Sequence, residues 1–186
     1  METSALRSLP DAQTVSDAIR AVIRDVPDFP KPGILFKDIT PMLGHPEVFQ
    51  LSIAAMHQHY AEARIDYVVG IESRGFIFGA PLALSLGAGF VPVRKSGKLP
   101  AECHRVEYAL EYGTDVLEIH KDAIAPGKRI VIVDDLLATG GTVRATLELV
   151  RAIGADVVGA AFVVELSFLN GRERLPDCEI LTLVTY

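Results

Sequence analysis

Apolar residues in the first part of the chain recur at the spacing of helices. Between residues 12 and 26 they lie on one face, which predicts a helix that Pro27 and Pro30 end. The residues of this face are Val15, Ala18, Ile19, Val22 and Ile23. A similar pattern predicts a second helix from about Pro46 to Glu62. The stretch between them, 29–38, is too rich in proline for a helix and is predicted to be an extended surface segment.

From residue 67 onward, short apolar runs alternate with helical patterns. The predicted strands are 67–71, 90–94, 129–133, 157–165 and 180–184, and the predicted helices are about 75–86 and 142–153, the latter capped by Gly154. Weak alternation over 115–120 predicts an edge strand, and 96–112 is expected to be a long loop or an irregular hairpin. Strands that alternate with helices are typical of an α/β fold, with a mostly parallel sheet covered by helices on both faces.

The stretch 129–142 combines a buried strand with chemically active residues. Asp134 and Asp135 follow the apolar run, and Thr139-Gly140-Gly141-Thr142 then opens a helix. Ligands of open α/β sheets bind at the carboxyl ends of the strands, and a helix N-terminus favours an anion. The glycines allow close approach of a phosphate, and the threonine hydroxyls add donors.

Asp134 and Asp135 do not suit the same phosphate, because like charges repel. They suit the hydroxyls of a sugar or a divalent cation. A ligand with a phosphate beside a diol, such as a ribose 5-phosphate, fits both halves of the segment. The chain contains no GxxxxGK[ST] or GxGxxG pattern, which argues against a P-loop and against a dinucleotide-binding fingerprint.

Composition narrows the class of protein further. At 186 residues and 49% hydrophobic, the chain is predicted to form one domain, with residues 1–40 as an N-terminal hood. The net charge of −6 argues against nucleic-acid binding, and the sequence has no apolar run of the roughly 18 to 20 residues that a membrane span needs. Cys103 and Cys178 lie far apart and no export signal is evident, so we expect a cytoplasmic protein.

The segment from 129 to 142 resembles the type I phosphoribosyltransferases, whose fingerprint is an apolar strand, two acidic residues and a short loop that ends in Thr-Gly-Gly-Thr. The resemblance implies their fold, binding of phosphoribosyl pyrophosphate (PRPP), and Mg²⁺ held mainly through PRPP, with Asp134 and Asp135 nearby. The residues expected to hold the phosphate and ribose are Asp134, Asp135, Ala138, Thr139, Gly140, Gly141 and Thr142.

A second anion site is expected where the strand 67–71 runs into Glu72-Ser73-Arg74-Gly75. The resemblance identifies this turn as a pyrophosphate loop, with Ser73 and Arg74 as ligands and a cis peptide near Glu72–Ser73. A basic cluster formed by Arg94, Lys95 and Lys98 follows the next strand. The resemblance assigns Arg94 and Lys95 to PRPP, and it allows Arg94 to act across a dimer interface.

The predicted loop, 96–113, suits a lid that excludes water from a reactive sugar cation. The Glu-Tyr pair before Gly113 resembles that of the adenine-specific branch of the family. The resemblance implies attack by adenine through N9, which must lose a proton, so a carboxylate above the base is able to act as general base. The resemblance makes Glu111 the proton acceptor and Tyr112 a lid residue.

The proline-rich stretch 29–39 resembles the signature of that same branch. An extended strand offers backbone C=O and N–H groups that complement N6 and N1 of adenine, and a 6-oxopurine reverses this pattern. By resemblance, Leu35 supplies the carbonyl and Lys37 the N–H, while Phe36 and Leu166 enclose the ring. Lys37 stands where some relatives carry Arg, which a backbone contact tolerates.

The expectation is therefore an adenine-specific phosphoribosyltransferase that makes AMP in purine salvage, acts on adenine and PRPP, and forms a homodimer as the resemblance implies. Two alternatives stay open at this point. One is a related transferase for hypoxanthine, xanthine or orotate. The other is a non-catalytic relative that senses PRPP or a nucleotide, although such proteins more often add a DNA-binding helix pair, for which residues 1–26 are too short.

Overall fold

The computed structural model describes residues 9–109 and 114–186, and the chain divides into two compact units at residues 55 and 56. In the first unit, helix α1 (Ala12–Val22) begins at Asp11, whose carboxylate accepts the Thr14 N–H at 3.0 Å. The predicted helix over 12–26 is too long. Strand β1 (Arg24–Pro27) follows α1 directly and pairs antiparallel with β2 (Leu35–Asp38).

The β1–β2 pair explains both the shortened helix and the proline-rich segment. The turn between the strands contains a cis Phe29–Pro30 peptide, and the Gly33 N–H donates to the Asp28 carboxylate at 2.7 Å. The rings of Phe29 and Phe36 pack edge to face, 5.1 Å apart. Residues 35–38 of the predicted extended segment thus form the second strand of a hairpin, and residues 28–34 form the turn that precedes it. The short helix α2 (Thr40–Leu43) and the helix α3 (Pro46–Tyr60) come next along the chain.

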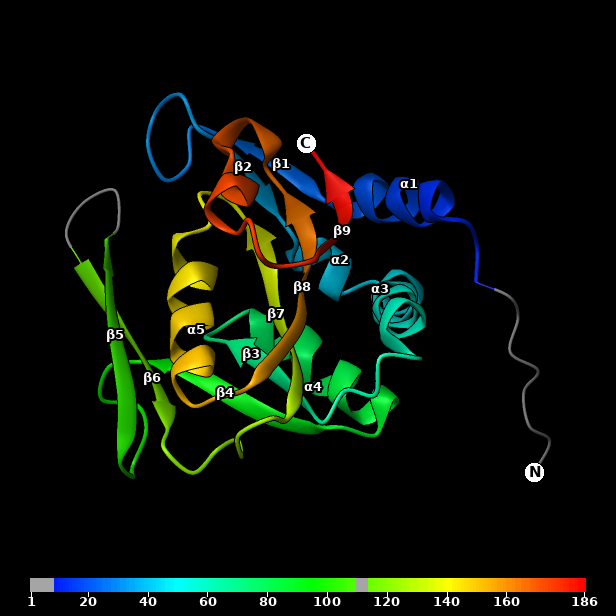
Figure 1. Ribbon diagram of the computed structural model, residues 1–186. Helices are drawn as coiled ribbons and strands as arrows, with labels where there is room; N and C mark the ends of the chain where they lie inside the picture. Colours follow the sequence, from blue (N-terminus) through cyan, green and yellow to red (C-terminus); the bar gives the residue numbers. More distant parts are fainter. Residues whose placement is uncertain (1–8, 110–113) are drawn as a thin grey trace. The chain divides into compact units, whose positions relative to one another are not determined.

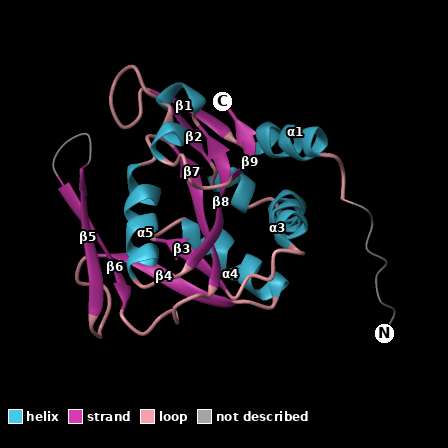
Figure 2. Ribbon diagram, in the orientation of Figure 1, coloured by secondary structure: helices cyan, strands magenta, loops and turns pink. Residues whose placement is uncertain are grey.

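The second unit is built on a seven-stranded sheet in the order β5-β6-β4-β3-β7-β8-β9 (Figures 1 and 2). The strands are β3 (Tyr67–Ile71), β4 (Gly89–Lys95), β5 (Cys103–Ala109), β6 (Thr114–His120), β7 (Arg129–Leu137), β8 (Asp156–Glu165) and β9 (Ile180–Thr185). Five of them, β4, β3, β7, β8 and β9, are parallel neighbours. The predicted mostly parallel α/β architecture is confirmed.

The prediction of an edge strand over 115–120 is wrong. Strand β6 lies between β4 and β5 and pairs antiparallel with both. The reason is that residues 103–109, which show little periodicity, form its partner β5. In the part of 96–112 that the structure describes, the hairpin reading is therefore the correct one.

Helices α4 (Gly75–Leu86) and α5 (Gly141–Ala152) cover opposite faces of the sheet. From β3, the connection through α4 leads to β4, toward the β5 edge of the sheet. From β7, the connection through α5 leads to β8, toward the β9 edge. Because both crossovers are right-handed, the two helices lie on different faces. With both faces covered, β7 is apolar without alternation, and Ile130 to Val133 are fully buried. The ends of β3 and β7 mark the point where the strand order reverses, the usual position of a ligand.

The remaining elements complete this unit. The C-terminus of α5 has the expected glycine cap: Gly154 has φ +79°, its N–H donates to the Arg151 carbonyl, and the Ala155 N–H donates to the Val150 carbonyl. Two short 3₁₀ helices, η1 (Ser167–Leu169) and η2 (Gly171–Arg174), connect β8 toward β9. None of the helices in the described part of the chain is long and apolar enough to cross a lipid bilayer.

Candidate active site

A pocket of about 440 Å³ lies in the second unit at the carboxyl ends of β3 and β7. Seven of the predicted site residues line it: Ser73, Arg74, Lys95, Asp134, Asp135, Ala138 and Thr142. Glu72, Tyr108, Asp115 and Leu136 complete the lining. The two anion sites predicted from separate stretches of sequence therefore open into one cavity, because β3 and β7 are adjacent parallel strands.

The two carboxylates of this pocket lie inside a strand. Strand β7 continues to Leu137, so Asp134 and Asp135 do not follow the strand as the sequence suggested but form part of it. Their side chains therefore alternate, and Asp135 is 5% exposed while Asp134 is half-buried. The Asp135 carboxylate accepts a hydrogen bond from Arg74 Nε at 2.5 Å.

Asp134 and Asp135 differ in their electrostatic surroundings. Burial, and then the neighbouring negative charge of Asp135, raise the pKa of Asp134 well above its ordinary value. Asp134 Oδ1 also accepts the Asp135 backbone N–H at 2.9 Å. The pocket thus contains one carboxylate paired with a guanidinium and a second one whose ionised form is disfavoured while no cation or sugar hydroxyl is bound.

The phosphate loop (Ala138 to Gly141) leads from β7 into α5. Gly140 has φ +77°, a left-handed conformation that favours glycine, and the next residue begins the helix. A Cβ on Gly140 would lie 2.5 Å from the Gly171 carbonyl oxygen, and a Cβ on Gly171 would lie 2.3 Å from the Ala138 carbonyl oxygen. The loop is therefore packed backbone against backbone on η2 and leads into a helix N-terminus, which is the kind of position that favours an anion.

Arg94 and Lys98 do not line the pocket, nor do Thr139, Gly140 and Gly141. The Arg94 guanidinium donates to Glu72 at 3.0 and 3.3 Å and lies 5.7 Å from the centre of the Phe76 ring. Glu72 also accepts the Lys95 backbone N–H at 2.9 Å. Arg94 lowers the pKa of Glu72, so this carboxylate stays ionised and orients the end of β4. The peptide between Glu72 and Ser73 is cis, as the resemblance implied.

Tyr108 and Asp115 are pocket residues that sequence reasoning missed. They face each other across the β5–β6 hairpin, where the Tyr108 hydroxyl lies 3.4 Å from Asp115 Oδ2, and Lys95 Nζ lies 3.1 Å from the same oxygen. Burial raises the pKa of Tyr108, and a hydrogen bond with Thr142 opposes that rise. The signal that could have found them is the position of two polar residues on paired strands, but β5 had not been recognised. Glu111 and Tyr112 lie outside the described residues.

The acidic residues of the pocket fit a magnesium ion that is held largely by a substrate. Mg²⁺ in proteins commonly binds one or two carboxylates together with substrate phosphates and water. Asp134 and Asp135 supply two carboxylates, and no cluster of three or more metal-binding side chains occurs within residues 9–109 and 114–186. The donor set therefore suits a metal that arrives with a polyphosphate.

The predicted base-reading residues are divided between the two units. Leu35, Phe36 and Lys37 form β2 of the first unit, where Lys37 Nζ contacts Asp25 Oδ1 at 2.6 Å. Leu166 follows β8 in the second unit, and its N–H donates to the Leu137 carbonyl at 2.9 Å. Leu166 is thus attached to the residue that precedes the phosphate loop. The grouping of these four residues around one ring stays a prediction.

Comparisons with known proteins agree with this geometry. Residues 40–180 match the family model described as the phosphoribosyl transferase domain. A protein of Gloeothece citriformis named adenine phosphoribosyltransferase is 59% identical, with 90% of this chain and 99% of the relative covered. A crystal structure of adenine phosphoribosyltransferase from Rhodothermus marinus has a TM-score of 0.88 and 54% identity, covering 94% and 99% of the two chains.

A third relative is described with ligands bound. The adenine phosphoribosyltransferase of Saccharomyces cerevisiae was crystallised with adenine and an imino-altritol 1,6-bisphosphate. Its structure has a TM-score of 0.88 and 47% identity, covering 92% of this chain and 99% of the yeast chain. That pair of ligands consists of a purine base and a sugar-like molecule with two phosphates.

Proposed function

The chain belongs to the adenine phosphoribosyltransferase family, and on that premise we propose that it transfers the 5-phosphoribosyl group of PRPP to N9 of adenine, with AMP and pyrophosphate as products. One observation carries the assignment to this pocket. Ala138 of the phosphate loop, Thr142, the carboxylate pair of β7 and two cations line a single cavity at the ends of β3, β4 and β7, the switch point of the sheet. The cations are Arg74 and Lys95. A ligand with phosphates at both ends of a ribose matches that order of donors and acceptors.

The pocket offers a distinct position for each part of PRPP. The phosphate loop and Thr142 bind the 5-phosphate through backbone N–H groups and a hydroxyl. Asp134 and Asp135 accept hydrogen bonds from the ribose hydroxyls. Ser73, Arg74 and Lys95 surround the pyrophosphate. Arg94 and Lys98 are proposed to add positive charge near it. Arg74 also orients Asp135 through their hydrogen bond.

Catalysis follows from where charge develops. As the bond from C1 of the ribose to pyrophosphate weakens, positive charge grows on the sugar and negative charge on the leaving group. Arg74 and Lys95 neutralise the departing pyrophosphate, and Asp134 and Asp135 face the cationic sugar. Mg²⁺, when bound, supplies further charge neutralisation on the pyrophosphate oxygens. Glu111, which the family resemblance makes the proton acceptor, is the proposed acceptor of the N9 proton.

Selection of adenine is assigned to the edge of β2. Residues two apart in a strand direct their backbone groups to the same edge, so the Leu35 carbonyl and the Lys37 N–H point the same way. The Leu35 carbonyl is proposed to accept from the N6 amine of adenine and the Lys37 N–H to donate to N1, with Phe36 and Leu166 proposed to enclose the ring.

A homodimer in the cytoplasm is the proposed state of the protein. The helix α4 is apolar on nearly every side, yet Leu84 is 84% exposed and Ile77 is 37% exposed. A helix that is hydrophobic all round is normally buried, so a second copy is the proposed cover of this face. Arg94, which lies beside Phe76 of α4, is then close to the interface. The two free cysteines, Cys103 and Cys178, suit a reducing compartment.

The test is an absorbance assay of the full chain with PRPP, Mg²⁺ and one base at a time: adenine, hypoxanthine, guanine or orotate. We expect turnover of adenine, and turnover of the 6-oxo bases lower by several orders of magnitude. Chelation of the metal should abolish the reaction, and readdition of Mg²⁺ should restore it. Equal rates with hypoxanthine would refute the adenine assignment, and PRPP binding without any turnover would favour a sensor.

A further inference from the structure

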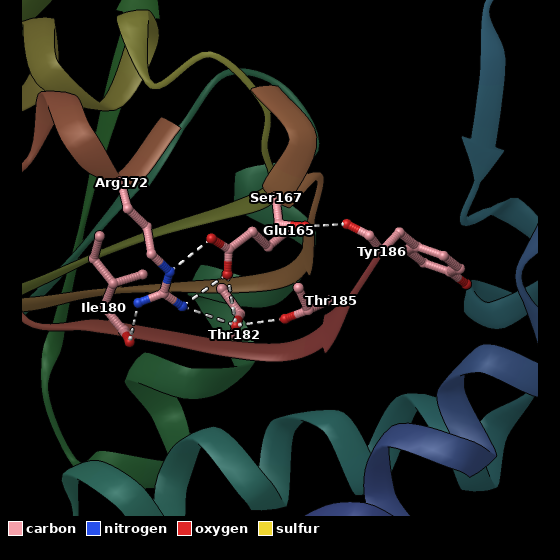
Figure 3. Close-up of polar contacts among 7 residues, drawn as sticks. All are labelled: Glu165, Ser167, Arg172, Ile180, Thr182, Thr185 and Tyr186. Carbon is pink, nitrogen blue, oxygen red and sulfur yellow. Dashed lines mark hydrogen bonds and ion pairs between the residues drawn. The ribbon is translucent and has the colours of Figure 1, made fainter. Parts of the chain in front are cut away.

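A compact ion pair lies beside the phosphate loop but outside the pocket. Glu165, the last residue of β8, accepts two hydrogen bonds from Arg172 of η2, from Nε at 2.6 Å and from Nη2 at 2.7 Å (Figure 3). This is the bidentate geometry that gives guanidinium–carboxylate pairs their strength and fixed orientation. Glu165 is 5% exposed, whereas the Arg172 side chain is 47% exposed.

The pair also connects η2 with the edge strand β9. Arg172 Nη2 and Glu165 Oε2 each lie 3.1 Å from the Thr182 hydroxyl, and Arg172 Nη1 donates to the Ile180 carbonyl at 3.4 Å (Figure 3). Arg172 is the largest cause that lowers the pKa of Glu165, so the carboxylate is ionised at neutral pH. The two ends of the turn 165–172 are thereby fixed to each other and to β9.

The turn 165–172 also packs against the phosphate loop. Gly171 precedes Arg172 directly, and its backbone is so close to Ala138 and Gly140 that an added Cβ would overlap a carbonyl oxygen. At the other end of the turn, the Leu166 N–H donates to the Leu137 carbonyl, one residue before the loop. The loop is therefore supported from outside by a segment whose shape depends on the Glu165–Arg172 pair.

We propose that Arg172 is a positioning residue of the PRPP site, and that its ion pair with Glu165 holds Gly171 against the phosphate loop so that the loop N–H groups are preorganised for the 5-phosphate. This inference rests on the function proposed above. Arg172 does not line the pocket and so acts only through the backbone it fixes.

The physical reason is that η2 is a short element with few backbone hydrogen bonds of its own. It spans four residues, and short 3₁₀ turns have poor hydrogen-bond geometry and little cooperativity. Without the guanidinium, Glu165 keeps its negative charge in a buried position with only the Thr182 hydroxyl as a partner. The turn then relaxes to bring solvent to that charge, and an anion site loses affinity when its donors must be ordered during binding.

The experiment compares Arg172→Ala and Arg172→Lys with the control Arg174→Ala. The control removes the second arginine of η2 and leaves the Glu165–Arg172 pair intact. PRPP affinity is measured by calorimetry with Mg²⁺, beside KM for PRPP, kcat and Tm. For Arg172→Ala we expect about tenfold weaker PRPP binding and a matching rise in KM, with kcat changed by less than about threefold. Arg172→Lys should recover only part of the loss, because an ammonium cannot form the bidentate contact. Arg174→Ala should match the wild type.

A double-mutant cycle with Gly171→Ala tests the route of the effect. If Arg172 acts through Gly171, the losses in PRPP affinity will be less than additive in the double variant. Added guanidinium ion should also restore PRPP binding to Arg172→Ala. Should Arg172→Ala fail to fold, Thr182→Val, which removes one partner of the pair, gives the same test and is expected to weaken PRPP binding by about threefold.

The outcomes separate this inference from the proposed function. Wild-type protein that does not bind PRPP would overturn the proposed function itself. Wild-type protein that binds PRPP, together with an Arg172→Ala variant of unchanged affinity and KM, would overturn only the positioning role. A lower Tm with unchanged PRPP affinity would do the same, because it shows that the pair stabilises the fold and not the loop. Fully additive losses in the cycle would contradict the route through Gly171.

Discussion

Thr142 has the most direct single-residue role proposed for this pocket. Its hydroxyl lies at the start of α5, where it hydrogen-bonds with Tyr108. Removing a donor from an anion site costs about 1–3 kcal/mol, so Thr142→Ala should raise KM for PRPP by roughly five- to hundredfold with a smaller effect on kcat. Steady-state kinetics at saturating adenine measures both constants.

Two matched variants isolate the hydroxyl of Thr142. Thr142→Ser keeps the donor and should restore most of the affinity for PRPP. Tyr108→Phe leaves the threonine in place but removes the contacts of the Tyr108 hydroxyl with Thr142 and Asp115, so it reports what that hydroxyl contributes. If Thr142→Ala leaves KM for PRPP unchanged, the 5-phosphate does not bind at this loop.

Glu165 gives a pH dependence of stability with a definite sign. Arg172 lowers its pKa below the ordinary value of 4.5, so its contribution is present above that value and is lost as the pH falls through the folded-state pKa. Glu165→Gln should therefore lower the free energy of unfolding by about 1–2 kcal/mol at pH 7, a figure reduced for the half-exposed arginine. The difference from wild type should shrink below pH 4.5.

Denaturant unfolding at a series of pH values measures this effect, and Asp156→Asn serves as the control. Asp156 lies at the opposite end of β8 and pairs with Arg129 at 3.0 Å, with both side chains substantially exposed. Its substitution should cost well under about 1 kcal/mol throughout the pH range. If the difference in the free energy of unfolding between wild type and Glu165→Gln stays constant down to pH 3, the charge of Glu165 is not what stabilises the folded protein.

At the level of single residues, the sequence predicts best where the chemistry is local. Asp134, Asp135 and Thr142 lie in one short segment, so one motif predicted them together, and they line the same pocket. Tyr108 and Asp115 come together only through the β5–β6 register, which no local pattern revealed. The Glu165–Arg172 pair was not predicted either, because the two residues meet only once β8, η2 and β9 are placed.

Among the elements, α4 depends on close backbone packing where it begins. A Cβ on Gly75 would lie 2.6 Å from the Val133 carbonyl oxygen and 3.1 Å from Asp134 Oδ1. Gly75→Ala must therefore move α4 away from β7, which should cost about 1–3 kcal/mol of stability and weaken PRPP binding by displacing Arg74. Chemical denaturation and calorimetric titration with PRPP measure the two effects.

The other end of α4 provides the control for Gly75→Ala. Gly87 has φ +67° and no atom within 4 Å of an added Cβ. Gly87→Ala should cost about 1 kcal/mol from backbone strain alone, with PRPP affinity unchanged. If both substitutions weaken PRPP binding equally, the effect reflects general loss of α4 and not the contact with β7.

Elements that carry strong periodicity were predicted well, and paired short strands were not. β3, β7, β8, α4 and α5 have apolar runs or helical spacing that burial enforces. The predicted helix includes most of β1 because Val26 stands at helical spacing from Val22 and Ile23, and only pairing with β2 separates the strand from α1. β5 was not predicted as a strand because residues 103–109 show little periodicity at the edge of the sheet.

For the molecule as a whole, the exposed face of α4 makes a prediction about assembly. Leu84→Glu places a charge on that face and should convert the proposed homodimer into monomers, as measured by sedimentation velocity. Leu84→Met keeps the face apolar and should leave the mass unchanged. A wild-type protein that already sediments as a monomer would refute the proposed assembly.

The class of fold could be predicted from the sequence because strands alternate with helices along the chain. The order of the strands in the sheet could not be predicted. Nothing in the chain states that β3 lies between β4 and β7, yet this order creates the cavity. The assignment of β2 as the strand that reads adenine rests on the family resemblance and stays a proposal. The relation of that strand to Leu166 stays a prediction.

The contact between Gly140 and Gly171 bears on how this enzyme could be redesigned. Because each glycine faces a carbonyl oxygen of the opposing segment, neither position has room for variation, and a saturation library there should return almost only glycine among active clones. Substitutions intended to change the accepted base are therefore better placed in β2 and at residue 166, which are proposed to contact the base. Tolerated substitutions should therefore occur at the surrounding positions and not at these two glycines.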